Sequence, residues 1–357
     1  MAYKILVINP GGGSTKIAYY EDEREVKRES IRHSPEELSK FPDTLSQLPY
    51  RKKMIEEKLT EWGIQVSKLS GVVGRGAPLK PLESGTYLVN EKMVNDIKTG
   101  RVQADHPSNL GALLAREFAE EHNIPAFIVD PVSVDEFIPE SRISGLPEIE
   151  RKSLSHALNM KMVARKAAEE IGKKYEELNM VIVHLGTGIS IGAHQRGKQI
   201  DVNNANDGGP FSPQRTGSLP VTQLVKLCYE GKYNKKQMIE KLTKKGGLLA
   251  YLGTDDIEEV EKKIDNGDEH ARLVYEAMIM QIAKEIGAMA TVLYGDVDAI
   301  VITGGMAHSR RLVEKIKERI RFITREIFVY PGENELEALA LGALRVLKGI
   351  EKPKVYN

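Results

Sequence analysis

The sequence predicts an α/β protein built from two domains, and three observations support this prediction. Short apolar runs typical of buried strands alternate with longer helical patterns, which is the order of elements in α/β folds. An apolar strand, a turn rich in Gly, Ser or Thr and a return strand begin at Ile5 and occur again from Met180, which predicts a duplicated fold. The length of 357 residues suits about two domains at roughly 150 residues each.

The first half of the chain predicts a β-hairpin followed by helices and strands. Asn9–Gly13 has the composition of a turn between an apolar run and an alternating run, so it is expected to close the hairpin. Asn109 precedes an apolar stripe and is the expected N-cap of its helix. The expected elements are strands at 5–8 and 16–20, a mainly helical region at 35–62, a short strand or loop beginning at 72, a helix at 109–122 and a strand at 125–129.

The second half repeats the hairpin and ends in a helix. The helix at 269–294 is apolar on most faces, so it is expected to be central and buried. Residues 233–267 are compatible with an insert, a mobile flap or a structural helix pair. The expected elements are a crossing segment at 139–149, a helix at 155–172, strands at 180–184 and 189–193, a loop at 203–217, the helix at 269–294, a strand at 298–303, a helix at 309–320, a strand at 327–330 and a helix at about 335–347.

Composition excludes several classes of protein. Lys and Arg number 51 and Asp and Glu number 51, so a neutral chain offers no bulk electrostatic case for nucleic acid or an anionic membrane as partner. The single cysteine, Cys228, excludes an internal disulfide and a cysteine metal cluster. No segment has the composition of a membrane span or a secretory signal. We therefore expect a cytoplasmic protein.

Three expected strands end in turns of small residues, at Asn9–Thr15, His184–Ser190 and Thr303–Ala307. Glycine lets backbone N–H groups approach an anion closely. The chain contains no Gly-Lys-Ser/Thr, so it has no P-loop, and Gly192 lies one residue too far along for the dinucleotide fingerprint. Each turn alone is also compatible with an ordinary turn, but the three together predict binding of nucleotide phosphates and base.

The order and spacing of these segments resemble the acetate and butyrate kinases, members of the actin, heat-shock-70 and sugar-kinase superfold. ILVINPGGGSTKI resembles the family's opening hairpin, HLGTGISIGAHQRGKQIDVN its second phosphate hairpin, ITGGMAHSRRL its adenosine-binding segment and NELEALALGAL its C-terminal segment. The resemblance covers essentially the whole chain. It implies two ribonuclease-H-like (actin-like ATPase) domains around a nucleotide cleft: residues 1–152, with 336–357 packing back onto them, and a nucleotide-binding domain at 153–335.

The short length and the Asn-Pro-Gly start resemble the butyrate branch of the family more than the acetate branch. This implies a butyrate-kinase-type phosphotransferase that moves the γ-phosphoryl group of ATP reversibly to butyrate or a branched short-chain fatty acid, giving acyl phosphate and ADP. It also implies Mg²⁺ and a homodimer or higher homo-oligomer. An acetate or propionate kinase, a sugar kinase and an actin-like or heat-shock-70-like ATPase that binds protein partners are the alternatives.

Asn9 occupies the first-hairpin position where actin-like ATPases and sugar kinases generally carry Asp. A carboxylate substrate, with a pKa of about 4–5, is already ionised at pH 7 and needs no general base. The enzyme must instead bring two anions together, so Asn9 in place of an acid removes one repulsive charge. The alternative is a simple turn residue before proline.

Two arginines and three histidines are the other catalytic candidates. Arg75 lies between Gly74 and Gly76, a placement expected to free the backbone, and Arg215 lies in the loop PFSPQRTG; the resemblance makes both ligands of the carboxylate and the phosphoryl group, whereas a surface ion pair is the alternative. By resemblance His156 hydrogen-bonds the phosphoryl oxygens and His184 lies near the phosphates. His106 is a weaker candidate.

The resemblance also implies nucleotide-binding and metal-binding residues. Gly12 stands where the acetate branch carries serine, so only backbone contact is expected there. Asp130 and Glu335 are the expected Mg²⁺ carboxylates, with Asp135 and Glu337 as competing choices. The full nucleotide-binding set is Gly12, Gly13, Ser14, Lys16, His184, Gly186, Thr187, Gly188, Gly304, Gly305 and Met306.

Two small residues suggest the size of the acyl pocket. Ala77 stands where acetate kinases carry valine, and Ser155 stands where they carry phenylalanine. Both differences are expected to enlarge the pocket, and each additional buried CH₂ contributes about 0.8 kcal/mol, roughly fourfold in binding. The sequence therefore predicts a preference for butyrate or branched short acids over acetate.

Overall fold

The structure is a computed structural model that describes residues 2–357, and its chain divides into two compact units. Unit 1 comprises residues 1–135, 157–159 and 334–357, and unit 2 comprises residues 136–156 and 160–333. Each unit has its own sheet and its own hydrophobic core. Residues 136–152, which sequence analysis assigned to the first domain, group with unit 2.

Within the described residues, unit 1 holds a seven-stranded mixed sheet in the order β12-β5-β6-β4-β1-β2-β3. β1, β2 and β3 form an antiparallel meander, and β4 and β6 extend it in parallel from β1. The first hairpin is thereby confirmed, although β1 continues through Pro10. The strands are β1 (Lys4–Pro10), β2 (Ser14–Glu21), β3 (Arg24–Arg32), β4 (Gly71–Arg75), β5 (Thr86–Leu88), β6 (Ala126–Val129) and β12 (Lys354–Val355).

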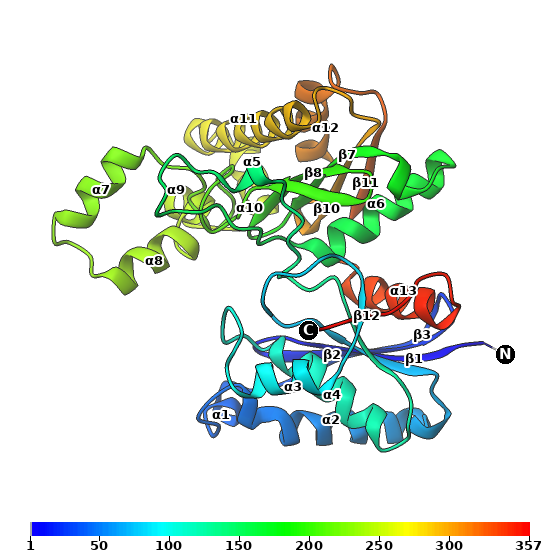
Figure 1. Ribbon diagram of the computed structural model, residues 1–357. Coiled ribbons are helices and arrows are strands. Elements are labelled where there is room, and N and C mark those ends of the chain that lie inside the picture. Colours follow the sequence, from blue (N-terminus) through cyan, green and yellow to red (C-terminus); the bar gives the residue numbers. More distant parts are fainter. Residues whose placement is uncertain (1) are drawn as a thin grey trace. The chain divides into compact units, whose positions relative to one another are not determined.

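Helices cover both faces of this sheet. Figure 1 shows α13 on one face and α2, α3 and α4 on the other, and both α4 and α13 contact β1, β4 and β6. Because α13 follows β11 of unit 2 along the chain but packs on the first sheet, its first residue, Glu335, lies in unit 1. The helices are α1 (Pro35–Leu38), α2 (Leu48–Trp62), α3 (Glu91–Lys98), α4 (Asn109–Glu120) and α13 (Glu335–Leu347).

The sheet of unit 2 repeats the central part of the first sheet. Its order is β11-β10-β7-β8-β9, with an antiparallel meander from β7 to β9 and parallel strands β10 and β11 on the other side of β7. The same connectivity joins β1, β2, β3, β4 and β6, so the predicted duplication is confirmed. The strands are β7 (Asn179–Leu185), β8 (Ile189–Gln195), β9 (Lys198–Val202), β10 (Ala299–Gly304) and β11 (Ile327–Pro331).

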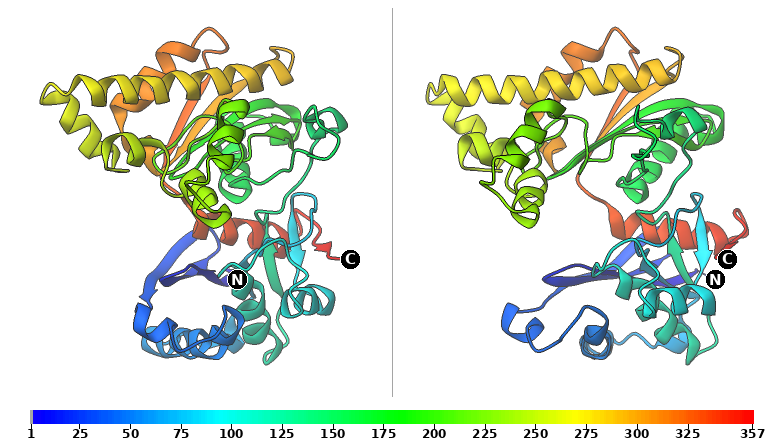
Figure 2. Two further views of the ribbon diagram at one scale, coloured as in Figure 1. Left: turned by 90° about the vertical axis from the view of Figure 1, so that its left-hand side faces the viewer. Right: turned by 60° about the vertical axis from the view of Figure 1, so that its left-hand side comes forward.

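The longest helix of unit 2, α11, runs along its sheet, as Figure 2 shows. The expectation that this helix is buried on most faces is wrong, because Leu273 is 68% exposed and Met280 is 44% exposed. The side of α11 that packs against the sheet and against α10 and α12 enters the core, through residues such as Ile282 and Ile286. The helices of this unit are α5 (Pro139–Arg142), α6 (Ala157–Ile171, whose first turn groups with unit 1), α7 (Val221–Tyr229), α8 (Lys235–Thr243), α9 (Gly247–Leu252), α10 (Ile257–Asp265), α11 (Glu269–Val292) and α12 (Arg310–Ile320).

The expectation of a mainly helical region at 35–62 is confirmed in outline, whereas the expectation that Asn109 is an N-cap is wrong. Residues 35–62 contain two helices separated by a turn and a short 3₁₀ segment, because the Ser-Lys-Phe-Pro stretch at 39–42 interrupts the helical pattern. Asn109 is the first residue of α4 rather than its N-cap, and its side chain donates to the carbonyl of Ala104 instead. None of the helices within residues 2–357 is long and apolar enough to cross a membrane.

Candidate active site

The turn of the first hairpin is closed by its own backbone. The N–H of Gly11 donates to the carbonyl of Ser14 at 2.7 Å, and Asn9 pairs with Lys16 across the strands. Gly12 and Gly13 are exposed, neither has a positive φ, and a Cβ on either would meet no atom within 4 Å. Nothing in the fold of this chain therefore requires glycine at these two positions, and their open surface is available to a ligand.

Predicted residues gather at one edge of the first sheet. β1, β4 and β6 are parallel neighbours, and their register places Asn9, Arg75 and Asp130 at the carboxyl ends of adjacent strands. This is the edge at which α/β sheets bind ligands. Glu335 joins the group at the start of α13.

Asn9, Arg75 and Glu335 form one hydrogen-bonded cluster. Arg75 Nη1 lies 2.9 Å from Glu335 Oε2, and Asn9 Nδ2 donates to the same oxygen at 2.7 Å. Arg75 Nη1 also lies 3.4 Å from Asn9 Oδ1. Asn9 is 4% exposed, whereas the side chains of Arg75 and Glu335 retain 23% and 14% exposure. The guanidinium is thus held in place while part of it stays open to an anion.

The glycines around Arg75 serve close packing rather than backbone freedom. A Cβ on Gly74 would lie 2.0 Å from the carbonyl oxygen of Gly111 in α4, and one on Gly76 would lie 2.4 Å from Pro131. Neither glycine has a positive φ, so the expectation that they free the backbone is wrong. They let the strand end lie directly against its neighbours, which fixes where the Arg75 side chain starts.

His106 is electrostatically linked to this cluster. Its Nδ1 accepts a hydrogen bond from the backbone N–H of Ser108, so the neutral ring carries its proton on Nε2. Burial and then the charge of Arg75 lower the pKa of His106. A neutral imidazole therefore lies close enough to Arg75 for the charge of Arg75 to lower its pKa.

The expected metal carboxylates have different surroundings. Oδ1 of Asp130 accepts from the hydroxyl of Ser84 at 2.6 Å and from the N–H of Gly85 at 2.7 Å, so it fixes a loop. Both hydrogen bonds to Glu335 go to Oε2, which leaves Oε1 without a protein donor among residues 2–357. These residues contain no cluster of three or more His, Cys, Asp or Glu suited to hold a metal alone. These residues suit a Mg²⁺ ion that is held mainly by nucleotide phosphates and water, to which the chain contributes a single carboxylate oxygen.

The second hairpin carries a pair of stacked histidines. His184 lies near the end of β7, and His156 immediately precedes α6. Their rings stack with centroids 3.9 Å apart and planes 9° apart. His156 Nδ1 lies 3.0 Å from the hydroxyl of Ser190, and His184 Nε2 lies 3.3 Å from a carboxylate oxygen of Glu333.

Arg215 lies directly against the turn of the second hairpin. A Cβ on Gly188 would come within 2.5 Å of its guanidinium, and Ser212 ties the Arg215 loop to the hairpin by donating to the carbonyl of Thr187. No ion pair to Arg215 occurs within the described part of the chain, and burial lowers the pKa of its guanidinium. The alternative of a surface ion pair is therefore wrong for Arg215. Its side chain lines an open cavity of about 700 Å³ together with Asp207, Gln214 and Lys244.

The two glycines of the third turn have different surroundings. Gly304 has a φ of 96°, and a Cβ there would lie 2.3 Å from the carbonyl oxygen of Leu185, so the fold itself requires glycine. Gly305 begins a 3₁₀ turn and has open space around it, as Gly12 and Gly13 do. Met306 is buried, at 7% exposure.

The two residues expected in the acyl pocket are both buried. Ala77 has no exposed surface and belongs to the core of unit 1. Ser155 is 6% exposed, and its hydroxyl exchanges hydrogen bonds with the side-chain amide of Gln199. Ser155 therefore has a defined structural partner in unit 2.

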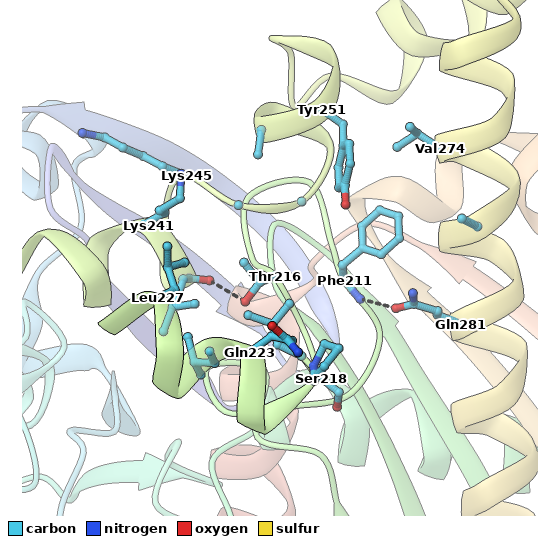
Figure 3. Close-up of a pocket in the computed structure, with 18 of the residues that line it drawn as sticks. Phe211, Thr216, Ser218, Gln223, Leu227, Lys241, Lys245, Tyr251, Val274 and Gln281 are labelled. Carbon is cyan, nitrogen blue, oxygen red and sulfur yellow. Dashed lines mark hydrogen bonds between the residues drawn. The ribbon is translucent and has the colours of Figure 1, made fainter. Parts of the chain in front are cut away.

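A second, mainly apolar cavity of about 670 Å³ lies beside the Arg215 loop and is shown in Figure 3. Thr216, the residue after Arg215, lines this cavity, and its hydroxyl lies 3.3 Å from the carbonyl of Leu242. The N–H of Phe211 donates to the side-chain oxygen of Gln281. Its walls include α8 and α9, which belong to the 233–267 segment that forms helices α8, α9 and α10. No predicted site residue is among those that line it.

Sequence reasoning missed three polar residues at the hairpins: Arg51, Ser190 and Glu333. Arg51 carried a usable signal, since it is a charged residue on the buried stripe formed by Leu48, Ile55 and Leu59 in α2. Ser190 and Glu333 carried none, because only the fold brings them to the two histidines.

Comparison with known proteins identifies related folds. A family model described as the Acetokinase family matches residues 149–327, half of the 357-residue chain. Acetate kinase from Porphyromonas gingivalis superposes with a TM-score of 0.79 and 19% identity over 97% of this chain and all of its own. A propionate kinase from Francisella tularensis superposes with a TM-score of 0.73 and 18% identity, over 95% of this chain and 98% of its own. A ROK family protein from Streptococcus pneumoniae, solved in complex with sucrose, superposes with a TM-score of 0.52 and 14% identity, over 98% of this chain and all of its own. The predicted fold class, that of actin-like ATPases, is confirmed.

Proposed function

Because the chain belongs to the acetokinase family, and so is a phosphotransferase that acts on a carboxylate with ATP or ADP, we propose that its acceptor is a short-chain fatty acid. The reaction is ATP + butyrate ⇌ ADP + butyryl phosphate, or the same exchange with a branched acid. A carboxylate oxygen attacks the γ-phosphorus, the bond from that phosphorus to the β,γ-bridging oxygen breaks, and ADP leaves with the electron pair.

The observation that carries this proposal is the Asn9–Arg75–Glu335 cluster. A sugar kinase needs a free carboxylate base to take a hydroxyl proton, whereas a fatty acid arrives ionised. The one carboxylate in this cluster, Glu335, is already hydrogen-bonded through Oε2 to Arg75 and Asn9. The cluster is therefore suited to hold an anion beside Arg75 and not to remove a proton.

The candidates in unit 2 complete the proposed chemistry. Arg215, which has no acidic partner among residues 2–357, neutralises charge on the phosphoryl oxygens. His156 donates a hydrogen bond to the transferring group, with His184 stacked against it. The glycines and neighbouring polar residues of the three turns bind the nucleotide through their backbone and side-chain donors.

Mg²⁺ is proposed to bind with the nucleotide. Glu335 supplies the oxygen Oε1, and Asp130 contributes through its place at the same sheet edge; Asp135 and Glu337 are the competing acids. The bound ion neutralises charge on the phosphates during transfer. The protein is further proposed to be cytoplasmic and to form a homodimer or a larger homo-oligomer.

The preferred acid is proposed from the two small buried residues. Ala77 and Ser155 stand where acetate kinases carry valine and phenylalanine, and the resemblance therefore favours a larger acyl pocket and butyrate or a branched acid over acetate. Acetate and propionate are the alternative substrates, since the names of two structural neighbours specify them.

A hydroxamate assay for acyl phosphate tests the proposal, with ATP, Mg²⁺ and a panel of acetate, propionate, butyrate, isobutyrate and glucose. We expect product with the acids and none that depends on glucose, and a higher kcat/KM for butyrate than for acetate. A strong acetate preference would refute the finer assignment only. Absence of acyl phosphate with every acid would refute the carboxylate kinase.

Arg75→Ala and Arg215→Ala test the two guanidinium groups in the same assay. Removing one charged donor from a transition state costs roughly 10²–10³ in rate. The matched control is Arg116→Ala, an arginine of α4 in unit 1 that pairs with Glu91 and Glu120. We expect the control to retain nearly full turnover, and unchanged turnover in either of the other variants would contradict the proposal.

A further inference from the structure

Arg51 is a fully buried arginine behind the first glycine hairpin. It belongs to α2 and has 0% exposure. No carboxylate forms an ion pair with it in the described part of the chain, whereas buried charges normally have a partner of opposite sign. Its position therefore needs an explanation beyond packing.

The guanidinium is bound by the turn and by the side chain of Gln47. Nη1 donates to the carbonyl of Gly11 at 2.9 Å and to the hydroxyl of Thr15 at 3.0 Å, and Nη2 lies 3.2 Å from the carbonyl of Gly12. Gln47 accepts from Nε and Nη2 at 3.1 and 2.9 Å. Neutral oxygens satisfy the donors and leave the positive charge of Arg51 uncompensated.

The remaining carbonyls of the turn are also occupied. The carbonyl of Gly13 accepts from the N–H of His33 at 2.9 Å, and the carbonyl of Ser14 accepts from the N–H of Gly11 at 2.7 Å. No hydrogen bond among residues 2–357 uses the N–H groups of Gly12 and Gly13, which are exposed. The carbonyls of the turn are thus bonded to the protein, while these two donors remain for a ligand.

His33 supports the same arrangement as a neutral group. The hydroxyl of Thr15, which accepts from Arg51, also lies 2.8 Å from His33 Nε2. His33 Nδ1 lies 3.3 Å from the hydroxyl of Tyr50. The chain of donors and acceptors runs from Arg51 outward and requires no second charge.

We propose that Arg51 is the positioning residue of the first hairpin: by binding the carbonyls of Gly11 and Gly12 from behind, it leaves the N–H groups of Gly12 and Gly13 for a phosphoryl group of the nucleotide. Its charge adds to the attraction without contact with the ligand. This inference rests on the proposed function, since it assigns the anion at the hairpin to ATP.

Three variants and two ligands test the inference. Arg51→Met removes the charge and the hydrogen bonds, and Arg51→Lys keeps the charge but cannot reach the same set of oxygens. The matched control is Lys53→Met on the same helix, whose side chain is 75% exposed and pairs only with Glu57. Binding of ATP and of adenosine, which lacks phosphates, is measured by isothermal titration at one ionic strength.

We expect Arg51→Met to weaken ATP binding at least tenfold and adenosine binding less than twofold, with KM for the carboxylate unchanged. Arg51→Lys should recover part of the ATP affinity, and Lys53→Met should match the wild type. Equal weakening of both ligands would mean a merely structural role and would overturn the inference. Unchanged ATP binding would overturn it as well.

Two further outcomes have defined meanings. If Arg51→Met does not fold, the ratio of ATP to adenosine affinity in Arg51→Lys decides, and a ratio equal to that of the wild type refutes the inference. If the wild type makes no acyl phosphate but binds ATP more tightly than adenosine, the carboxylate kinase is refuted and the same ratio still decides on Arg51. A wild type with no preference for ATP over adenosine overturns the role of Arg51 directly.

Discussion

Replacing Asn9 by aspartate tests why this hairpin carries an amide. Asn9 Nδ2 donates to Glu335 Oε2 at 2.7 Å, so Asn9→Asp places a second carboxylate oxygen against that of Glu335 with almost no change in size. Asn9 is 4% exposed, so water screens the pair poorly. The amide therefore prevents repulsion inside the protein as well as repulsion of the two anionic substrates.

The size of the effect follows from the distance. Two unit charges 2.7 Å apart repel by about 6 kcal/mol at an effective dielectric constant of ~20, and Arg75 at 2.9 Å from Glu335 offsets part of this. Two carboxyls this close are expected to share a proton, which raises the pKa of the pair. A net loss of about 3 kcal/mol corresponds to a decrease of more than 100-fold in kcat/KM at pH 8.

The assay is the pH profile of acyl phosphate formation. A shared proton restores both the charge and the hydrogen bond of the amide, so the activity of Asn9→Asp relative to the wild type should rise as the pH falls from 8 to 6. The control is Asn9→Ala, which loses the hydrogen bond without adding charge; we expect roughly a tenfold loss with no such pH dependence. Wild-type activity of Asn9→Asp at pH 8, or equal and pH-independent losses in both variants, would refute the reasoning.

Two other predictions concern the second hairpin and the support of the first. Gly188→Ala places a Cβ within 2.5 Å of the Arg215 guanidinium, so we expect kcat/KM to fall roughly 100-fold at unchanged Tm. The control is Gly287→Ala, whose Cβ meets no neighbour and which should keep its activity. Full activity of Gly188→Ala would contradict the role of Arg215. Burial and the charge of Arg51 lower the pKa of His33 to about 4 in the folded protein. Between pH 6.5 and pH 4 the unfolded chain therefore binds a proton at His33 that the folded protein does not bind, so the free energy of unfolding falls by up to about 3 kcal/mol over this range. Urea unfolding at several pH values should show a smaller decrease for His33→Gln but not for His122→Gln, an exposed control; equal slopes would exclude His33 as the source.

Sequence patterns predicted the architecture because its signals are local. The two hairpins are apolar strands around glycine turns, and the later strands are short apolar runs, so period and composition were sufficient. The long helix α11 was misjudged because composition counts apolar residues but does not say which face meets the sheet, and Leu273 and Met280 lie on the other face.

The contacts within the candidate site were beyond the reach of local patterns. Asn9 and Glu335 are 326 positions apart, and only the packing of α13 on the first sheet brings them to 2.7 Å. Placing Arg75 and Asp130 near Asn9 was possible in principle, because parallel neighbouring strands end at the same edge. The Glu335 carboxylate that binds Arg75 gave no such signal.

Glycine shows the same limit in a different form. The sequence treats Gly12, Gly74 and Gly304 alike, as small residues in turns. In the structure Gly74 is required by the backbone of Gly111, and Gly304 by its φ of 96° and by Leu185. Gly12 is required by nothing in the chain. Gly12 therefore leaves open space in front of the turn that a side chain would occupy, and its N–H is free of hydrogen bonds within residues 2–357.

The duplicated hairpins share a charge arrangement that their sequences do not reveal. Behind the first turn lies Arg51, bound to the carbonyls of Gly11 and Gly12, and against the second turn lies Arg215, in contact range of Gly188. Neither arginine has an acidic partner within residues 2–357. Leaving two largely desolvated guanidinium groups without counter-charges is unfavourable unless a bound anion compensates them. We therefore propose that both turns bind anions, and transfer of a phosphoryl group from a polyphosphate to a carboxylate supplies such anions.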